Sequence, residues 1–368
     1  MNLIFSPVYD DGDIPDNGIA FYEQLQQFSV LTTPVSLLAL GDKAYAKFCE
    51  AGHLYQQELE RMGAAEEDSL ILVDGNPIEP MQQWLQIQLG LNSDESQIQQ
   101  TEKKLTLELV KHQTLTKDSE HGNLAYRLVF NAAGDEAFNY QVGDLLAITP
   151  PDDSRERLYS IASAPSVAGN QVELCVGLLS YQENGETVYG RCSQYLTTEL
   201  KTGNQLQAKW KSGGGLTLPE SDTPMIMVAT GAGIAPMMCL LNERIAKQHA
   251  GENWLLFGNR KSTADYYYQD ELEAMQTNGQ LHYLDTAFSR ESEKKVYVQD
   301  ILAENRERLA DWLLNKHARL YVCGRRDLRG SILDQVRLVL SAQITDPQIV
   351  ENTLKEMELS RQICLELF

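Results

Sequence analysis

The chain has 368 residues, enough for two or three domains that each bury a core of their own. Hydrophobic residues make up 43% and charged residues 23%, an ordinary globular composition that excludes a largely disordered chain. With 31 Lys and Arg against 52 Asp and Glu, the formal net charge is −21, so nucleic acid and anionic membranes are poor partners, and a basic docking face on a partner protein is the natural complement.

Residues 1–92 are predicted to alternate strands with helices, an order typical of a parallel sheet with crossover helices. In chain order the expected elements are the strand NLIFS, the helix IAFYEQLQQF, the strand PVSLLALGD, the helix AKFCEAGHLYQQELERMGA and the strand SLILVDG. Residues 93–104 are polar and unpatterned, so we interpret them as a linker.

Residues 105–220 are predicted to form a β domain. Apolar and polar residues alternate in short runs separated by glycine and asparagine turns, which favours an antiparallel barrel or sandwich. The expected strands are LTLELVKHQTL, AYRLVFN, DLLAITP, RLYSIAS, VELCVGLLS and LQAKW.

Over residues 221–368 strands and helices alternate again, which predicts a second parallel-sheet α/β domain. The expected strands are PMIMVAT, NWLLFG, LHYLDTAFS and ARLYVCG, with helices at 236–249, 266–277, 299–315 and 327–342.

Neither a disulfide framework nor a metal site is expected. The six cysteines are scattered, without a C-x-x-C pair or a nearby histidine cluster, which indicates reduced thiols in a cytoplasmic setting. The first residues, MNLIFSPVYDDGD, lack the basic region and apolar core of a signal peptide. The longest uncharged apolar stretch, 225–241, is interrupted by Gly231, Gly233 and Pro236, so we expect no membrane insertion by this chain.

The stretch VATGAGIAPM at 228–237 runs from an apolar strand through a glycine turn into a helix. Glycine backbone at a helix N-terminus offers N–H groups and the positive end of the helix dipole to a pyrophosphate. By itself the motif also fits a strand-to-helix turn without a ligand.

Two further stretches carry phosphate-binding chemistry. In SRESEKKVYVQD (289–300) an arginine fork suits a phosphate on a ribose, the group that separates NADP from NAD, although a solvated charged loop is an alternative. In RLYSIAS (157–163) a guanidinium suits a phosphate and a tyrosine ring suits stacking, although a surface turn that leads into a strand is an alternative.

The motifs RLYS, GRCS, GAGIAP, FGNR, SR…K-x-Y-x-Q and YVCG stand in the order and spacing of the ferredoxin–NADP reductase family. Over about residues 105–368 the chain resembles the diflavin type of that family, which includes sulfite reductase flavoproteins and NADPH–haemoprotein reductases. The resemblance implies a multi-domain NADPH-dependent oxidoreductase with an antiparallel β-barrel FAD-binding domain and a parallel-sheet NADP-binding domain. It implies an electron acceptor that is a protein or a metal complex, such as sulfite reductase haemoprotein, a cytochrome or a flavodoxin.

For FAD, the resemblance implies that Arg157 pairs with the pyrophosphate, that Tyr159 stacks on the isoalloxazine and that Ser160 hydrogen-bonds near N5. It implies a second pyrophosphate-binding turn at 190–193, capped by backbone and by the Ser193 hydroxyl. The implied FAD residues are Arg157, Leu158, Tyr159, Ser160, Val176, Gly177, Gly190, Arg191, Cys192, Ser193 and Phe368. Val176 and Gly177 also fit ordinary core, and Arg191 stands where the family usually has a small residue.

For NADP, the implied residues are Thr230, Gly231, Gly233, Ile234, Arg260, Ser289, Arg290, Lys295, Tyr297 and Gln299. The implied catalytic group is Ser160, Cys323 and Glu366, with no metal. The family ends with acid–x–aromatic, which implies that Phe368 is a displaceable lid over the flavin, and a frayed apolar tail is the alternative.

Two departures from the family keep a second function open. Arg325 replaces the usual Asp or Gly after YVCG. GRRDL and TAFSR are similar to reductases fused to membrane PepSY segments, which leaves a ferric-siderophore or iron reductase component as an alternative. A non-catalytic electron-transfer adaptor is a third hypothesis.

Residues 1–92 resemble the second half of a flavodoxin-like FMN domain, with Tyr9 and Tyr45 as the rings that would sandwich FMN. The family's first strand and phosphate loop have no counterpart in this sequence, and Asp10, Asp11 and Asp13 would repel a phosphate. The expected cofactors are therefore FAD and NADP(H), and these features weigh against FMN. The exposed apolar edge of such a sheet leaves open a fragment of a longer product or pairing with another chain.

Overall fold

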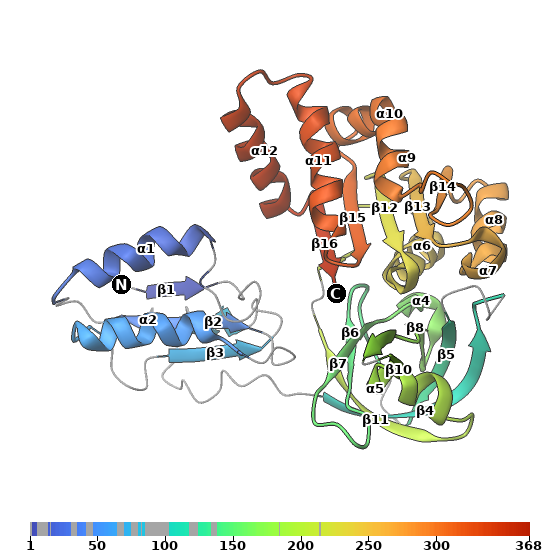
Figure 1. The fold of residues 1–368 in the computed structure, drawn as a ribbon, viewed down its shortest axis with the longest axis horizontal. Coiled ribbons are helices and arrows are strands. Elements are labelled where there is room, and N and C mark those ends of the chain that lie inside the picture. Colours follow the sequence, from blue (N-terminus) through green and yellow to red (C-terminus); the bar gives the residue numbers. More distant parts are fainter. Residues whose placement is uncertain are drawn as a thin grey trace. The chain divides into compact units, whose positions relative to one another are not determined.

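A computed structural model of the chain describes residues 2–5, 14, 16–30, 35–41, 47–64, 70–74, 80–81, 83–84, 103–117, 124–133, 138–183, 185–212 and 215–368 (Figure 1). These residues belong to two compact units. The first is Met1–Lys103 with Lys211–Gly213, and the second is Lys104–Trp210 with Gly214–Phe368. The finer division into 1–92, 93–104, 105–220 and 221–368 stays a prediction.

The first unit is built on a three-stranded parallel sheet, as the alternation of strands and helices predicts. Its strands lie in the order β1 (Asn2–Phe5), β2 (Ser36–Gly41) and β3 (Leu70–Asp74). Leu37 packs with residues of helices α1 (Asp16–Gln27) and α2 (Glu50–Arg61), whereas its neighbour Leu38 packs with Trp84 in a separate cluster. Because successive strand residues point to opposite faces, both faces of this sheet are covered.

The second unit begins with a nearly closed antiparallel barrel. Its strands follow the order β7-β6-β11-β4-β5-β8, and a bridge between Ile161 and Leu174 brings the two edges together. The strands are β4 (Lys103–Thr114), β5 (Ala125–Ala132), β6 (Leu145–Ile148), β7 (Arg157–Ser160), β8 (Gln171–Gly177) and β11 (Gln205–Lys211). This confirms the expected barrel.

Short elements connect strands of the barrel. They are α4 (Pro165–Ala168), the hairpin β9 (Ser180–Glu183) and β10 (Glu186–Tyr189), α5 (Arg191–Gln194) and a π-helical turn at Tyr195–Glu199. The sequence analysis did not predict the hairpin, because its residues are mostly exposed and show no apolar alternation.

The rest of the second unit is a five-stranded parallel sheet in the order β14-β13-β12-β15-β16. The strands are β12 (Met225–Thr230), β13 (Asn253–Asn259), β14 (Tyr283–Phe288), β15 (Arg319–Gly324) and β16 (Ile363–Leu367). Strand order reverses between β12 and β15, so the crevice at their carboxyl ends is the favoured ligand site of such a sheet.

Helices cover both faces of this sheet. Met227 of β12 packs with α6 (Ile234–Ala246), α8 (Gln269–Thr277) and barrel residues, whereas its neighbour Val228 packs with the helices of the other face. These are α9 (Val298–Glu304), α10 (Arg306–Ala310), a π-helical turn at Asp311–Asn315, α11 (Leu328–Ser341) and α12 (Pro347–Leu359). The barrel and one face of the sheet therefore share a core.

Three helix predictions need correction. The helix expected at 266–277 begins only at Gln269, as α8, and a separate short helix, α7 (Ser262–Asp265), precedes it. The helix expected at 299–315 is interrupted at Asn305. Helix α12 was not predicted, although Asp346 and Pro347 form a recognisable start: the Asp346 carboxylate accepts a hydrogen bond from the Gln348 N–H at 2.8 Å.

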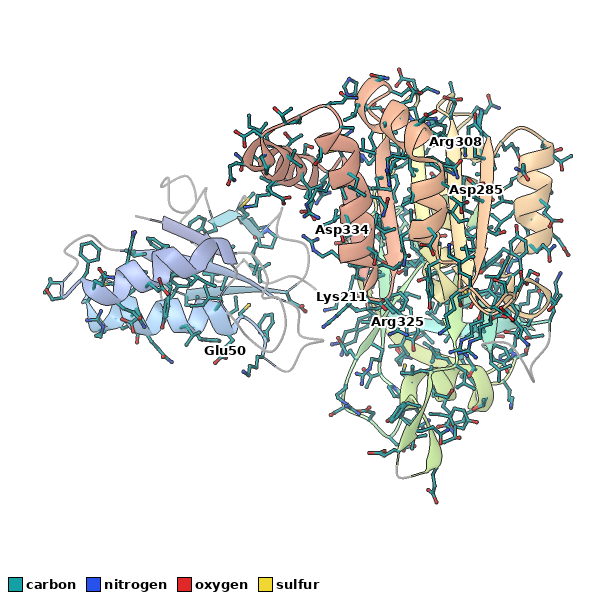
Figure 2. All side chains as sticks on the ribbon, turned by 45° about the horizontal axis from the view of Figure 1, so that its top comes forward. Glu50, Lys211, Asp285, Arg308, Arg325 and Asp334 are labelled. Carbon is teal, nitrogen blue, oxygen red and sulfur yellow. The ribbon has the colours of Figure 1, made fainter. Side chains whose placement is uncertain are left out.

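The two ends of the parallel sheet carry different charged side chains (Figure 2). Toward its amino ends, Arg308 pairs with Asp285 at 3.2 Å and stacks over the ring of Tyr283 at 3.9 Å. Arg325 lies at the carboxyl ends, toward the barrel. None of the helices in the described part of the chain has the length and apolarity to cross a membrane.

Candidate functional site

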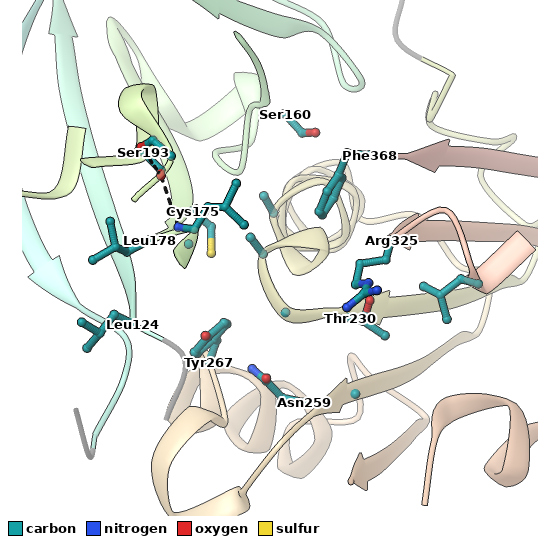
Figure 3. A pocket seen from close by; sticks show the side chains of 18 of the residues that line it. Leu124, Ser160, Cys175, Leu178, Ser193, Thr230, Asn259, Tyr267, Arg325 and Phe368 are labelled. Atoms are coloured by element: carbon teal, nitrogen blue, oxygen red, sulfur yellow. Dashed lines mark hydrogen bonds between the residues drawn. The ribbon is translucent and has the colours of Figure 1, made fainter. Parts of the chain in front are cut away.

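A cavity of about 1000 Å³ lies between the barrel and the carboxyl ends of the parallel strands (Figure 3). The barrel contributes β7 with residues 177–181 and 190–193, and the sheet contributes residues that follow β12, β13, β14 and β15, with the C-terminal residue after β16. Cofactor pockets typically measure about 300–1,000 Å³. The cavity is therefore large enough for an extended ligand or for two adjoining ones.

The lining is positively charged, although the chain as a whole is strongly acidic. Among the described residues that line the cavity, the charged side chains are those of Arg155, Arg157, Arg191, Arg260, Arg325 and Asp327. Walls of one sign attract a ligand of the opposite sign. The cavity is therefore suited to phosphate groups.

Ser160, Cys323 and Glu366 are brought together beside this cavity. Cys323 and Glu366 are register partners in the parallel pair β15 and β16, and Ser160 ends β7 of the barrel. The Ser160 hydroxyl donates a hydrogen bond to Glu366 Oε1, and the Cys323 thiol donates to the same oxygen at 3.9 Å. The meeting of these three side chains was predicted, and their catalytic role stays a prediction.

Burial controls the protonation of this group. Cys323 is only 1% exposed, and burial first, then the neighbouring Glu366, raises the pKa of its thiol well above the usual value. Burial also raises the pKa of Glu366, against the lowering effect of its hydrogen bonds from Ser160 and Cys323. Glu366 Oε2 is buried and has no hydrogen-bond partner among the described residues. The local environment therefore shifts both groups toward their neutral forms compared with the same groups in water.

Only Ser160 of the three lines the cavity, so Cys323 and Glu366 lie just behind its wall. Phe368 lies on the same side of the cavity as Ser160 (Figure 3). The Phe368 N–H donates to the Gly324 carbonyl at 3.0 Å, and its side chain is 63% exposed. The chain end is therefore a paired strand rather than a frayed tail.

Tyr159 and Arg157 lie on the barrel wall as expected. The Tyr159 ring packs against the barrel core while lining the cavity, and burial raises the pKa of its hydroxyl well above the usual value. Arg157 donates through Nη1 to the Glu156 carbonyl at 2.9 Å. Leu158 and Gly177 also line the cavity.

The turn at 190–193 differs from the expectation in its polar contacts. The Ser193 hydroxyl donates to the Gly190 carbonyl at 2.8 Å and accepts from the Leu179 N–H at 3.2 Å (Figure 3), so it stabilises the turn, and its role toward an anion stays a prediction. Arg191 pairs with Glu199 at 2.6 Å and with Asp152 at 3.0 Å. The first N–H groups of α5 have no acceptor within the helix. Their role as donors to an anion stays a prediction.

Several of the implied binding residues are mostly or fully buried. The side chains of Val176 and Ile234 are fully buried, and Gly233 does not line the cavity. A Cβ on Gly233 would lie 2.3 Å from the Cys323 carbonyl oxygen, so this glycine allows helix and strand to approach closely. Cys192 lines the cavity only marginally, being 6% exposed and donating its thiol to the Ile148 carbonyl at 3.6 Å. Side chains of these residues are therefore poor candidates for polar ligand contacts.

Most of the implied NADP residues lie together at the cavity, on the side of the parallel sheet. The residues that line the cavity are Thr230, Gly231, Arg260, Ser289, Tyr297 and Gln299. Arg290 and Lys295 are exposed and lie outside the lining, although the Arg290 N–H donates to the Arg260 carbonyl at 2.8 Å. Burial, and then the charge of Arg290, lower the pKa of Arg260.

Many lining residues were missed by the sequence analysis, and Cys175 and Arg155 are two of them. Cys175 lines the cavity from β8, one position before the expected Val176, and strand alternation could have indicated that these neighbours face opposite sides. Arg155 also lines the cavity and is paired with Asp153 at 3.0 Å.

An ion-pair network joins the two walls of the cavity. Arg127 of β5 contacts Glu173 of β8 and Glu271 of α8, both at 2.7 Å. The Tyr268 hydroxyl donates to Glu173 at 2.9 Å. Because the network connects the barrel with helix α8 of the parallel-sheet part, it stabilises the relative position of the two walls.

The candidates for FMN, Tyr9 and Tyr45, lie outside the described residues. Within the described ranges, no group of three or more His, Cys, Asp or Glu side chains is placed to hold a metal ion.

Comparison with known proteins identifies the two α/β regions. A family model described as oxidoreductase NAD-binding domain matches residues 227–332, and one described as flavodoxin matches residues 2–84. The first match implies FAD and NADPH as cofactors, and the second implies FMN.

Curated relatives are sulfite reductase (NADPH) flavoprotein alpha-components. That of Vibrio parahaemolyticus is 41% identical over 184 residues, covering 50% of this chain and 28% of the relative. That of Zymomonas mobilis is 30% identical over 320 residues, covering 84% of this chain and 51% of the relative. The chain thus spans only 28% to 51% of the length of these relatives.

Proposed function

From the combination of a flavodoxin-type domain with an oxidoreductase NAD-binding domain, as in diflavin reductases, we propose that this chain is the NADPH- and FAD-binding part of a flavoprotein reductase. The observation that carries the proposal is the Ser160–Glu366–Cys323 group at the wall of a cavity shared by barrel and sheet. The cationic lining fits two dinucleotides, since each carries a pyrophosphate.

A bound FAD would supply hydride acceptance from NADPH and one-electron transfer to an acceptor. The protein residues would bind and orient the cofactors and exclude water. Arg157 and the amide groups at the start of α5 would hold phosphate, and Tyr159 would provide a flat surface for a ring. Glu366 holds the Ser160 hydroxyl in one orientation at the wall, and the raised pKa of Cys323 keeps a thiolate charge away from the reacting atoms.

For the acceptor we propose a redox protein with a basic docking face, in line with the charge of −21. The name of the relatives favours a sulfite reductase haemoprotein. The GRRDL and TAFSR stretches favour, as the second candidate, a ferric-siderophore or other iron reductase component. Steady-state NADPH oxidation with the haemoprotein, cytochrome c and ferric chelates distinguishes these acceptors, and a colourless protein that oxidises no NADPH would leave the non-catalytic adaptor.

Flavin content tests the proposal directly. Flavin extracted from purified protein is expected to contain close to one FAD per chain and little FMN, because Asp10, Asp11 and Asp13 disfavour a phosphate. Arg157→Ala is expected to weaken FAD binding by about 10- to 100-fold, the usual cost of a lost charge-assisted hydrogen bond. Equimolar FMN would contradict the expectation for the front unit, and FAD retention unchanged in Arg157→Ala would contradict the assigned role of Arg157.

Phe368→Ala is expected to improve the use of NADH relative to NADPH by about 2- to 10-fold. A ring that covers the flavin must move before nicotinamide can enter, and a stacked aromatic pair contributes about 0.5–1.5 kcal/mol. NADH lacks the phosphate contacts that offset this displacement, so it gains more from removal of the ring. Anaerobic stopped-flow reduction with each coenzyme measures the ratio.

The alanine variant is preferable to deletion because it keeps the Phe368 N–H that donates to Gly324. Phe368→Tyr is the matched control, since it retains a stacking ring and should leave the ratio close to that of the wild type. A ratio that does not change in Phe368→Ala would place the ring away from the path of the nicotinamide.

A further inference from the structure

Arg325 enters the cavity beside the glycine turn. Strand β12 pairs with β15 on one side and with β13 on the other, so the turn that follows Thr230 lies between the ends of β15 and β13. A Cβ on Gly324 would lie 2.2 Å from Thr230 Oγ1, which shows how closely the ends of β12 and β15 approach. Arg325 therefore leaves the sheet directly beside Gly231, and Figure 3 shows its guanidinium near Thr230.

Arg260 enters from the other side of the same turn. It follows β13, whose Gly258 is the register partner of Thr230, and it lines the cavity together with Arg325. Burial and the charge of Arg290 lower the pKa of Arg260, and Arg325 adds to that lowering. Arg260 and Arg325 therefore line the cavity from the two strands that flank the end of β12.

The ion pair of Arg325 within the protein is weak. Arg325 Nε lies 3.6 Å from Asp327 Oδ1, and the two side chains are 79% and 71% exposed. Exposed pairs of this kind contribute little stability. The Arg325 guanidinium can therefore bind an anionic ligand and lose only its weak ion pair with Asp327.

We propose that Arg325 binds the pyrophosphate of the dinucleotide coenzyme over the glycine turn, opposite Arg260, and thereby adds a coenzyme-binding cation that an acid or glycine at this position would not supply. The inference rests on the proposed function, because it takes the ligand of the glycine turn to be NADP(H). Arginine presents its N–H donors in a fork that matches phosphate oxygens. Arg290 follows β14, which lies two strands away from β12, so in this proposal Arg290 binds the 2′-phosphate.

Two ligand fragments, each carrying one phosphate group of NADP⁺ but not the other, distinguish the roles of the two arginines. ADP-ribose carries the pyrophosphate without a 2′-phosphate, and 2′-AMP carries the 2′-phosphate without any 5′-phosphate. Isothermal titration of the FAD-loaded protein with NADP⁺ and with each fragment, or competition against NADP⁺ where binding is weak, gives the dissociation constants.

Arg325→Ala is expected to weaken the binding of NADP⁺ and ADP-ribose by about 10-fold and that of 2′-AMP by much less. Arg290→Ala is expected to show the reverse, with the binding of NADP⁺ and 2′-AMP weakened by about 10- to 100-fold and that of ADP-ribose almost unchanged. Arg325→Lys should recover part of the ADP-ribose affinity, because it restores the charge without the fork.

Arg329→Ala is the matched control. It removes the same charge four residues further on, but Arg329 lies outside the cavity lining and pairs with Glu358 at 2.7 and 3.2 Å. Affinity for all three ligands should stay at the wild-type value in this variant.

Each failure has a separate meaning. Wild-type protein that does not bind NADP⁺ would overturn the proposed function itself. Wild-type binding with unchanged ADP-ribose affinity in Arg325→Ala would overturn only the role of Arg325. Selective loss of 2′-AMP binding in Arg325→Ala would place Arg325 at the 2′-phosphate. An equal loss of affinity in Arg329→Ala would show that the effect comes from the general charge of this surface, and it would overturn the assigned role of Arg325.

Discussion

Replacing Glu366 by alanine is expected to slow the reduction of FAD by NADPH by about 100-fold. Glu366 does not line the cavity, so it acts through Ser160, whose hydroxyl donates to Glu366 Oε1 at the wall. Without the carboxyl, this hydroxyl loses its fixed orientation, and a misplacement of about 1 Å costs about this factor in rate. Stopped-flow reduction at saturating NADPH measures the step, with KM expected to change little.

Glu366→Gln separates positioning from loss of a folded structure. The amide can still accept a hydrogen bond from Ser160, so reduction should be slowed much less than in Glu366→Ala. The rate of FAD reduction in Glu366→Gln should also lose any pH dependence that arises from ionisation of the Glu366 carboxyl. Equal rates in the two variants would contradict the positioning role.

The same substitution has a defined effect on stability. Burial raises the pKa of Glu366 above its value in the unfolded chain, so the stability associated with its protonated form is complete at low pH and is lost as pH rises through the raised pKa. Thermal unfolding should therefore show Glu366→Gln to be more stable than the wild type above that pKa, with no gain below the unfolded pKa of about 4.3. A constant difference across this range would contradict the raised pKa.

Replacing Gly233 by alanine is expected to lower the free energy of unfolding of the second unit by about 3 kcal/mol. The new Cβ would lie 2.3 Å from the Cys323 carbonyl oxygen, 2.6 Å from its carbonyl carbon and 3.0 Å from the Gly324 nitrogen. All three are backbone atoms, so the clash is relieved only if the start of α6 moves away from β15. In a unit of this size the melting temperature should fall by about 6–12 °C.

Gly330→Ala is the control for this variant. Gly330 lies within α11, and a Cβ there would meet no atom within 4 Å, so alanine should stabilise the helix by up to about 1 kcal/mol. Urea denaturation of the two variants therefore gives changes of opposite sign. A Gly233→Ala variant as stable as the wild type would show that α6 and β15 can separate without cost.

Much of the fold was predictable because its signals are local. The apolar run of β12 followed by Gly231 and a helix indicates a parallel-sheet unit from a few consecutive residues. The alternation in β4 similarly indicates a barrel strand. Helix α12 was equally readable, since its buried residues Val350, Leu354 and Met357 follow helical spacing, and its omission was an error of interpretation.

The hairpin β9–β10 was missed for a different reason. Its strands are mostly exposed and show no apolar pattern, but the Asn-Gly pair at 184–185 is the sequence typical of a two-residue hairpin turn and was overlooked. Its position is decided by antiparallel pairing from Ser180 to Tyr189 and by contact of Leu179 with the turn at Gly190.

By itself, the sequence determined the type of each domain, the place of the glycine turn and the residue types suited to phosphate and ring binding. Only the tertiary structure decided which of those residues reach the cavity. Alternation along β8 indicates that Cys175 and Val176 face opposite ways, but packing on both sides of the strand decides that Cys175 lines the cavity. Ser160 and Glu366 meet across 206 residues because the barrel docks on the sheet beside the paired ends of β15 and β16, and no local pattern contains that contact.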